Sequence, residues 1–234
     1  MRTVNFVSQL LLLAGCVAAF AQDIPSGYKL LYSQNFESPA SIKDFVFSDP
    51  AAWRLGKDES GNGCLELFGK SRYTPKHRSP FNIALINGRE FGDFIMDVEL
   101  QSTVQPYNHQ DMCLFFGFQS TNQFYYAHLA VRPDPNAHNL FIVNDAPRTN
   151  FAAEVSNGVV WGNGWHKVRL QRQGAEIKVF FDSMTKPALV GRNATFSKGF
   201  VGFGSFDDKG KIRNVKIYGT GFDEKQAGFF KPAQ

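Results

Sequence analysis

The sequence predicts an all-β protein built as a sandwich of two antiparallel sheets. Its 234 residues include 24 Phe and 21 Gly, a composition that favours short strands and tight turns. From Gly27 onward the chain consists of short runs with alternating or wholly apolar patterns, separated by clusters of Gly, Pro, Asn and Asp. Long stretches with the apolar spacing of a helix are hard to find, so helical content is expected to be low.

Twelve of these runs are predicted as strands, and so many strands in one domain imply two stacked sheets. They are Lys29–Phe36, Trp53–Leu55, Cys64–Phe68, Ala84–Ile86, Phe94–Leu100, Met112–Gln119, Phe124–Val131, Asn139–Asn144, His166–Gln171, Ile177–Phe181, Gly199–Ser205 and Ile212–Tyr218. Turn-forming residues separate them at Gly61-Asn62-Gly63, Asn87-Gly88, Pro133-Asp134-Pro135, Asn163-Gly164 and Asp208-Lys209-Gly210. Short helical turns are expected around Ala40–Asp44, with Ser38 and Ser41 as potential caps, and near Pro50–Trp53.

The N-terminal segment predicts export. Residues 1–21 have the pattern of a signal peptide, with Arg2 as the only charge and Ala19-Phe20-Ala21 as a cleavage motif before Gln22. A second processing site lies within it, because Leu13-Ala14-Gly15-Cys16 resembles a bacterial lipobox that would place a lipid on Cys16. A retained membrane span is disfavoured, since the apolar run is shorter than the ~20 residues needed. The expected location is periplasmic or extracellular, with an outer-membrane lipoprotein as the alternative.

The rest of the chain is predicted as one domain over residues 27–220, followed by a loosely held tail over residues 221–234. The net charge of +4 arises from interspersed residues, so nucleic acid is not an expected partner. Cys64 and Cys113 lie in apolar strand patterns, where either a disulfide or two buried free thiols fit.

Three stretches carry a family resemblance. They are Arg89–Leu100, the pair Gly164–Arg172 and Ile177–Asp182, and the pair Gly199–Asp208 and Ile212–Tyr218. They resemble the concanavalin A-like lectin/glucanase superfamily, a jelly roll of two antiparallel sheets with one concave face, and among its members exported bacterial domains that are laminin-G-like or 3-keto-disaccharide hydrolase-like. The resemblance implies a jelly-roll sandwich and a role in carbohydrate binding or chemistry outside the cytoplasm.

Polar and aromatic residues concentrate between residues 107 and 150. His109 and Asp111 are two apart, as are Tyr126 and His128, so each pair projects to one side of an extended strand. These four are the candidate acid and base residues, because imidazole, phenol and carboxylate groups can transfer protons near neutral pH. Candidate sugar-binding residues, chosen for planar hydrogen-bonding groups and aromatic faces, are Tyr107, His138, Asn139, Asn144 and Arg148. Imidazole and carboxylate are also transition-metal ligands, so a metal held by His109, Asp111, His128 and His138 is a weaker alternative.

Further carboxylates are candidates for other roles. Asp97 and Glu99 lie about 6–7 Å apart along a strand, close to the spacing in glycosidases. The Glu-x-Asp-x-x-Glu signature of family-16 glucanases is absent, however, so these two are interpreted as solvated or groove-lining. Asp207 with Glu37 is a candidate for the structural calcium site that many such jelly rolls have.

The leading functional hypothesis is an exported hydrolase or lyase acting on a glycan or a modified disaccharide. A non-catalytic carbohydrate-binding or adhesion module is the first alternative, and a structural envelope protein is the second. The fold alone does not separate them, because this sandwich serves all three purposes.

Overall fold

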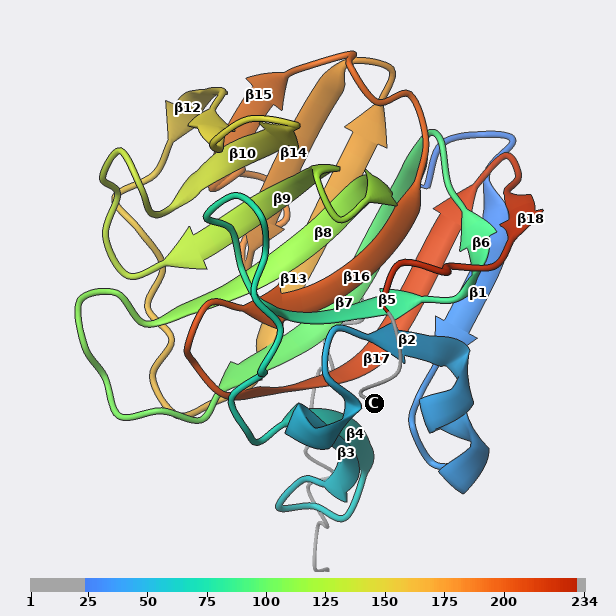
Figure 1. The fold of residues 1–234 in the computed structure, drawn as a ribbon, viewed down its shortest axis with the longest axis vertical. Coiled ribbons are helices and arrows are strands. Elements are labelled where there is room, and N and C mark those ends of the chain that lie inside the picture. The colour runs from blue at the N-terminus through green and yellow to red at the C-terminus, as the bar shows by residue number, and fades with distance from the viewer. Residues whose placement is uncertain (1–23, 231–234) are drawn as a thin grey trace, which may run out of the picture.

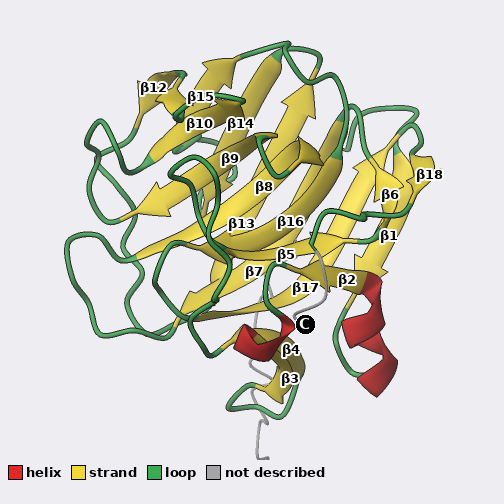
Figure 2. Ribbon diagram, viewed as in Figure 1, coloured by secondary structure: helices red, strands yellow, loops and turns green. Residues whose placement is uncertain are grey.

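The computed structural model describes residues 24–230, so the predicted signal peptide and the lipobox at Cys16 lie outside the described residues. Two large antiparallel sheets face each other, with the strands of one behind those of the other (Figure 1). Helices are confined to two short turns near the N-terminal end of this part (Figure 2). The all-β, two-sheet prediction is therefore confirmed. None of the helices within residues 24–230 is long and apolar enough to cross a membrane.

One sheet has nine strands within the described residues, in the order β12-β15-β14-β13-β7-β17-β4-β3, with β1 also paired to β17. The strands are β1 (Lys29–Gln34), β3 (Trp53–Lys57), β4 (Gly63–Leu67), β7 (Phe94–Ser102), β12 (Ala152–Val155), β13 (His166–Gln173), β14 (Glu176–Phe181), β15 (Leu189–Arg192) and β17 (Gly210–Gly219). The predicted hairpin of β13 and β14 is confirmed, with Leu170 opposite Val179.

The other sheet has seven strands in the described part of the chain, in the order β11-β10-β9-β8-β16-β5-β2. They are β2 (Phe45–Phe47), β5 (Asn82–Ile86), β8 (Asp111–Ser120), β9 (Gln123–Ala130), β10 (Asn139–Asn144), β11 (Thr149–Asn150) and β16 (Phe200–Ser205). A small third sheet pairs β6 (Gly88–Glu90) with β18 (Asp223–Lys225). The sequence prediction missed six strands, all of them only two to four residues long: β2, β6, β11, β12, β15 and β18.

The main core fills the space between the two sheets. On β7 the alternate residues Phe94, Met96, Val98 and Leu100 all enter it, as the alternating pattern predicts. From the other sheet Tyr125 enters the same core, whereas its neighbour Tyr126 lies on the outer face. Adjacent residues of a strand point to opposite faces, and both tyrosines are buried because each face is covered.

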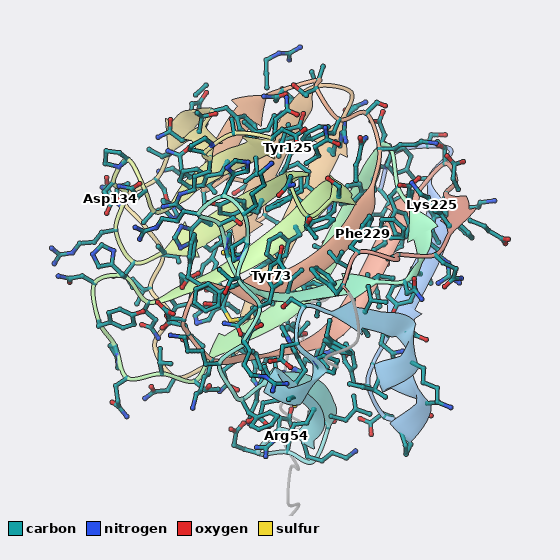
Figure 3. All side chains as sticks on the ribbon, in the orientation of Figure 1. Arg54, Tyr73, Tyr125, Asp134, Lys225 and Phe229 are labelled. Atoms are coloured by element: carbon teal, nitrogen blue, oxygen red, sulfur yellow. The ribbon has the colours of Figure 1, made fainter. Side chains whose placement is uncertain are left out.

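The outer face of the seven-stranded sheet carries a second apolar cluster, which explains why β8 and β9 are buried on both sides. Phe118 and Phe124 stack there with ring centroids 4.7 Å apart. The segment over residues 68–81 and the C-terminal tail cover this face, and Figure 3 shows Tyr73 and Phe229 in front of the sheet. The ring of Phe229 lies 5.3 Å from that of Phe118.

This packing differs from the loosely held tail that the sequence predicts. Within residues 221–230, β18 pairs with β6, and Phe229 and Phe230 pack against the second cluster. Burying aromatic rings stabilises such a segment, because each removes a large apolar area from water. The two helical turns were predicted, and they are the 3-10 helices η1 (Pro39–Asp44) and η2 (Pro50–Ala52). Ser38 caps the first as expected, and Asp49 caps the second.

Cys64 and Cys113, the cysteines within residues 24–230, are free thiols, so the open question of a disulfide between them is answered. Cys64 lies on β4 of the nine-stranded sheet and Cys113 on β8 of the seven-stranded sheet, and both are buried.

Candidate functional site

A cavity of about 310 Å³ opens at one end of the outer face of the seven-stranded sheet. Strands β8 and β9 contribute its innermost residues, and loops before β8, before β10 and after β16 contribute its walls. The lining residues are Arg78, Tyr107, His109, Asp111, His128, Asp134, Asn136, Ala137, Arg148, Phe206 and Asp207. The structure thus brings together six of the predicted site residues: Tyr107, His109, Asp111, His128, Arg148 and Asp207.

Asp111 and His128 form the innermost part of this cavity. Asp111 is the first residue of β8, and Cys113, two residues on, lies directly opposite His128 on β9. Side chains two apart on a strand share a face, as do directly opposed residues on neighbouring strands, so the three groups converge. His128 Nε2 lies 3.1 Å from Asp111 Oδ2, and the Cys113 thiol donates to the same oxygen over 3.3 Å. All three side chains are buried.

The tautomer of His128 follows from its surroundings. Nδ1 lies 3.2 Å from the backbone carbonyl oxygen of Asn136, which can only accept, so Nδ1 carries a proton. The ring also has aromatic neighbours that are tilted against it, with the ring centroid of Phe206 5.3 Å away. Both nitrogens therefore face protein groups rather than open solvent.

The carboxylate of Asp208 holds the backbone of Asp111 in place. Asp208 Oδ2 accepts the backbone N–H of Asp111 over 2.7 Å, and Oδ1 accepts the hydroxyl of Tyr107 over 2.6 Å. Burial raises the pKa of Asp208 to about 6, although these two hydrogen bonds act in the opposite direction. Burial, and then the adjacent Asp208 carboxylate, raise the pKa of Tyr107. Tyr107 is thus oriented at the cavity rim by a buried acid.

Arg148 forms the opposite wall. Its guanidinium donates to the hydroxyl of Tyr126 over 2.7 Å and to the backbone oxygen of Asn136 over 3.1 Å. It also lies 4.8 Å from the ring centroids of both Phe141 and Phe206, close enough for cation–π attraction. These contacts hold the planar group in one orientation next to the cavity.

Tyr126 does not line the cavity itself. Its ring is fully buried between neighbours and its hydroxyl is held by Arg148. Burial raises the pKa of this phenol. It acts as a support for Arg148, since a buried phenol of raised pKa is a poor source or acceptor of protons.

His138, Asn139 and Asn144 also lie outside the cavity lining. His138 is completely buried with φ +46, accepts the Ala130 N–H at Nδ1 and faces the Ser156 hydroxyl at Nε2, 2.9 Å away. Burial, and then the nearby His128, lower the pKa of His138 to about 4, so it is neutral at pH 7. Asn139 Oδ1 accepts the Ala152 N–H, and Asn144 is exposed at the other end of β10.

The carboxylates outside the 107–150 region behave differently from their predicted roles. Asp97 is not solvated but buried, in a two-pronged pair with Arg169 at 2.6 and 2.7 Å, and Glu99 pairs with Arg213 at 2.7 Å. Glu37 accepts from the Gly63 N–H and pairs with Lys57.

Asp207 lines the cavity and Glu37 does not. The two proposed calcium ligands therefore do not share this cavity, and a calcium site formed by Glu37 and Asp207 stays a prediction.

Sequence reasoning overlooked some of the cavity residues. Arg78 comes from the covering segment and Phe206 from the turn after β16, both distant in sequence from the 107–150 region. Asn136 takes part through its backbone carbonyl, which no residue pattern reveals. From the sequence, Cys113 was considered only as a disulfide partner or a buried free thiol, and not as a site residue. Its spacing of two from Asp111, combined with the antiparallel pairing of β8 and β9, is the signal that links it to His128.

Comparisons with known proteins agree on the fold. No protein-family model matches the sequence, and no curated protein matches it. Among solved structures, the carbohydrate-binding module CBM66 of Bacillus subtilis has a TM-score of 0.55 at 13% identity, over 75% of this chain and 96% of that one. A predicted glycosyl hydrolase of Parabacteroides distasonis has a TM-score of 0.52 at 13% identity, over 80% and 98% of the two chains.

A third similar structure is a Bacillus subtilis protein of unknown function with a galectin-like fold. Its TM-score is 0.50 at 15% identity, over 85% of this chain and 100% of that one. At such identities the likeness concerns the fold. The chain has the concanavalin A-like jelly-roll fold that the sequence resemblance predicts.

Proposed function

We propose that this protein binds a carbohydrate in the cavity formed by β8, β9 and their loops. The observation that carries the proposal is the arrangement around Arg148, whose guanidinium plane is fixed beside Phe206 at the cavity wall. A guanidinium has five N–H donors, of which contacts within the described residues use three. The remaining donors lie next to an apolar ring, the combination that suits a sugar's hydroxyls and its C–H face.

Other groups at the rim extend this surface. Tyr107 is 45% exposed and is oriented by Asp208, and His109 lies 3.9 Å from Asp134 across the opening. Together they offer donors, acceptors and a second aromatic face at the same entrance. The similar CBM66 fold, in a protein that is itself a carbohydrate-binding module, supports the same class of ligand.

Binding is favoured over catalysis by the state of the predicted acid and base residues. Tyr126 is buried behind Arg148, and both nitrogens of His128 face protein groups, so neither presents a free proton-transfer atom to a ligand. A hydrolase or lyase is the second candidate, because Asp111 and His128 contact each other and both line the cavity. A structural envelope protein would have no use for such a lined cavity.

A calorimetric screen of the purified protein against polysaccharides and oxidised disaccharides, with product analysis, tests this proposal. We expect binding without turnover, and we expect Arg148→Met to weaken it roughly 10–100-fold, because hydrogen bonds to a charged group contribute about 1.5–3 kcal/mol. Arg192→Met, an exposed arginine on β15, is the matched control and should bind normally. Failure to bind any saccharide, or an unchanged affinity in Arg148→Met, contradicts the proposal, and product formation selects the enzyme instead.

We also propose that the protein is exported, to the periplasm or beyond it, as the pattern of residues 1–21 indicates. Intact mass spectrometry of the envelope-derived protein tests this. Cleavage before Gln22 gives an unmodified chain, whereas processing at the lipobox leaves a diacylglycerol-modified Cys16 as the first residue. Retention of residues 1–21 in the mature protein contradicts export by either route.

A further inference from the structure

Three different metal-ligating groups meet at the inner end of the cavity. Asp111, Cys113 and His128 each offer one ligand atom, and these atoms lie within 4.8 Å of one another in the described part of the chain. All three side chains are buried, so the cluster is not a chance meeting of mobile surface groups. Two of them, Asp111 and His128, also line the cavity, which gives the cluster a route to solvent.

The imidazole of His128 is oriented as in a metal site. In the neutral ring, with Nδ1–H donating to the Asn136 carbonyl, the lone pair of Nε2 is directed inward. Nε2 is buried and lacks an aligned hydrogen bond within residues 24–230, although Asp111 Oδ2 is only 3.1 Å away. Two lone pairs at this distance repel each other unless a cation lies between them. A backbone carbonyl is one of the usual hydrogen-bond partners of the second nitrogen in a metal-bound histidine.

The carboxylate of Asp111 is also held in an orientation that suits a metal. Its Oδ1 accepts the Ser205 hydroxyl over 3.0 Å, which leaves Oδ2 to face His128 and Cys113. Zinc bond lengths of about 2.0–2.3 Å in a tetrahedral site place neighbouring ligand atoms roughly 3.3–3.6 Å apart. The observed separations from Asp111 Oδ2, 3.1 Å to the imidazole and 3.3 Å to the thiol, are close to this range. The imidazole and thiol ligand atoms also lie within 4.8 Å of each other, so the three groups face a common point.

We propose that Asp111 Oδ2, Cys113 Sγ and His128 Nε2 bind a divalent transition metal of the zinc type. Mixed nitrogen, sulfur and oxygen donors suit zinc or cobalt and do not suit calcium, which takes oxygen ligands alone. Three protein ligands leave a fourth position, and the placement of Asp111 and His128 directs it to the cavity. On binding, the Cys113 thiol loses its proton to solvent and the thiolate bonds to the metal.

Cobalt provides a direct test, because a thiolate ligand gives Co²⁺ a charge-transfer absorption that nitrogen and oxygen ligands do not. The purified protein is treated with a chelator and a reductant and then titrated with Co²⁺ alone. We expect one equivalent to bind with this absorption, and we expect zinc to displace it. If the unaltered protein shows no such band, the proposal is overturned. A proton, rather than a metal, would then lie between Asp111 and His128.

Variants assign the ligands. Cys113→Ser should abolish the charge-transfer band, whereas Cys64→Ser, the other buried cysteine, should retain it. Ser205→Ala keeps all three ligands and should weaken cobalt binding roughly 10–100-fold while the band persists. A band that survives Cys113→Ser, or is lost in a folded Cys64→Ser, contradicts the assignment. Circular dichroism verifies folding, and if Cys113→Ser does not fold, the unaltered protein's titration and the Ser205→Ala variant still decide.

Discussion

Two buried carboxylates, one on each sheet, differ in how completely their surroundings satisfy them. Asp97 on β7 is held by Arg169 through two parallel hydrogen bonds of 2.6 and 2.7 Å, a charged pair with matched geometry. Asp111 on β8 faces a histidine nitrogen without an aligned hydrogen bond and a thiol that is a weak donor. Asp97 belongs to a complete pair, and Asp111 belongs to an incomplete cluster.

The difference separates structural groups from candidate functional ones. A complete pair has no capacity left for a ligand, and Asp97 lies outside the cavity, whereas Asp111 lines it. Burial raises the pKa of Asp97 even though Arg169 acts against this, which shows how much the carboxylate depends on its partner. The sequence alone made both carboxylates candidates, and only their partners distinguish them.

The largest loss of stability is expected from breaking the Asp97–Arg169 pair. Asp97→Asn leaves the Arg169 guanidinium buried without a countercharge, so the free energy of unfolding should fall by about 3–5 kcal/mol. Urea denaturation with fluorescence detection measures it. The double variant Asp97→Leu with Arg169→Met should recover most of the loss, because an apolar pair of similar volume is often neutral. A loss below about 1 kcal/mol in Asp97→Asn would show that the pair is solvated after all.

His138 extends the comparison to the histidines, since its two nitrogens are satisfied while Nε2 of His128 is not. Its pKa of about 4 lies below the ordinary value of 6.5, so the unfolded chain binds the extra proton between these pH values. The contribution of the neutral His138 imidazole to stability is complete above pH 6.5 and is lost as the pH falls toward 4. At pH 4 the loss should reach about 3 kcal/mol.

Denaturant melts between pH 4 and pH 7 measure this slope. His138→Asn, a residue that tolerates the left-handed backbone at this position, should be less stable at pH 7 and show a shallower slope. Ser156→Ala keeps the buried imidazole and should lower stability at every pH without changing the slope. If stability depends on pH equally steeply in His138→Asn and in the unaltered protein, His138 is not the group responsible for this pH dependence.

The fold was accessible from sequence because apolar alternation and turn residues act locally. The alternation over Phe94–Leu100 predicts a strand with one buried face, and β7 has it. The second apolar cluster was not predicted, because it depends on Phe229 and Phe230 folding back over a sheet whose strands lie far away in the chain. Short edge strands such as β11 were missed for a different reason, since two residues hold no periodic pattern.

The site was only half accessible from sequence. The contact between Asp111 and His128 depends also on the pairing of β8 with β9. Spacing by two predicts only that His109 and Asp111, and likewise Tyr126 and His128, project to one side of a strand. It could not show that His138, ten residues along the chain from His128, turns away through a left-handed backbone and hydrogen-bonds Ser156. The bonding partners of a polar residue come from distant segments, and these decide whether it is structural or free to bind.

The smallest loss of stability is expected from Asp111→Asn, the same substitution made in the incomplete cluster. In Asp111→Asn the amide oxygen can still accept from Ser205, and the amide N–H can donate to Nε2 of a neutral His128. The free energy of unfolding, measured with a chelator present, should therefore change by about 1 kcal/mol or less, against 3–5 kcal/mol for Asp97→Asn. A loss as large as that in Asp97→Asn would mean that Asp111 and His128 form a charged pair as complete as the one on β7. Both carboxylates would then be structural, and the cavity would have to bind its ligand through Arg148 and the rim residues alone.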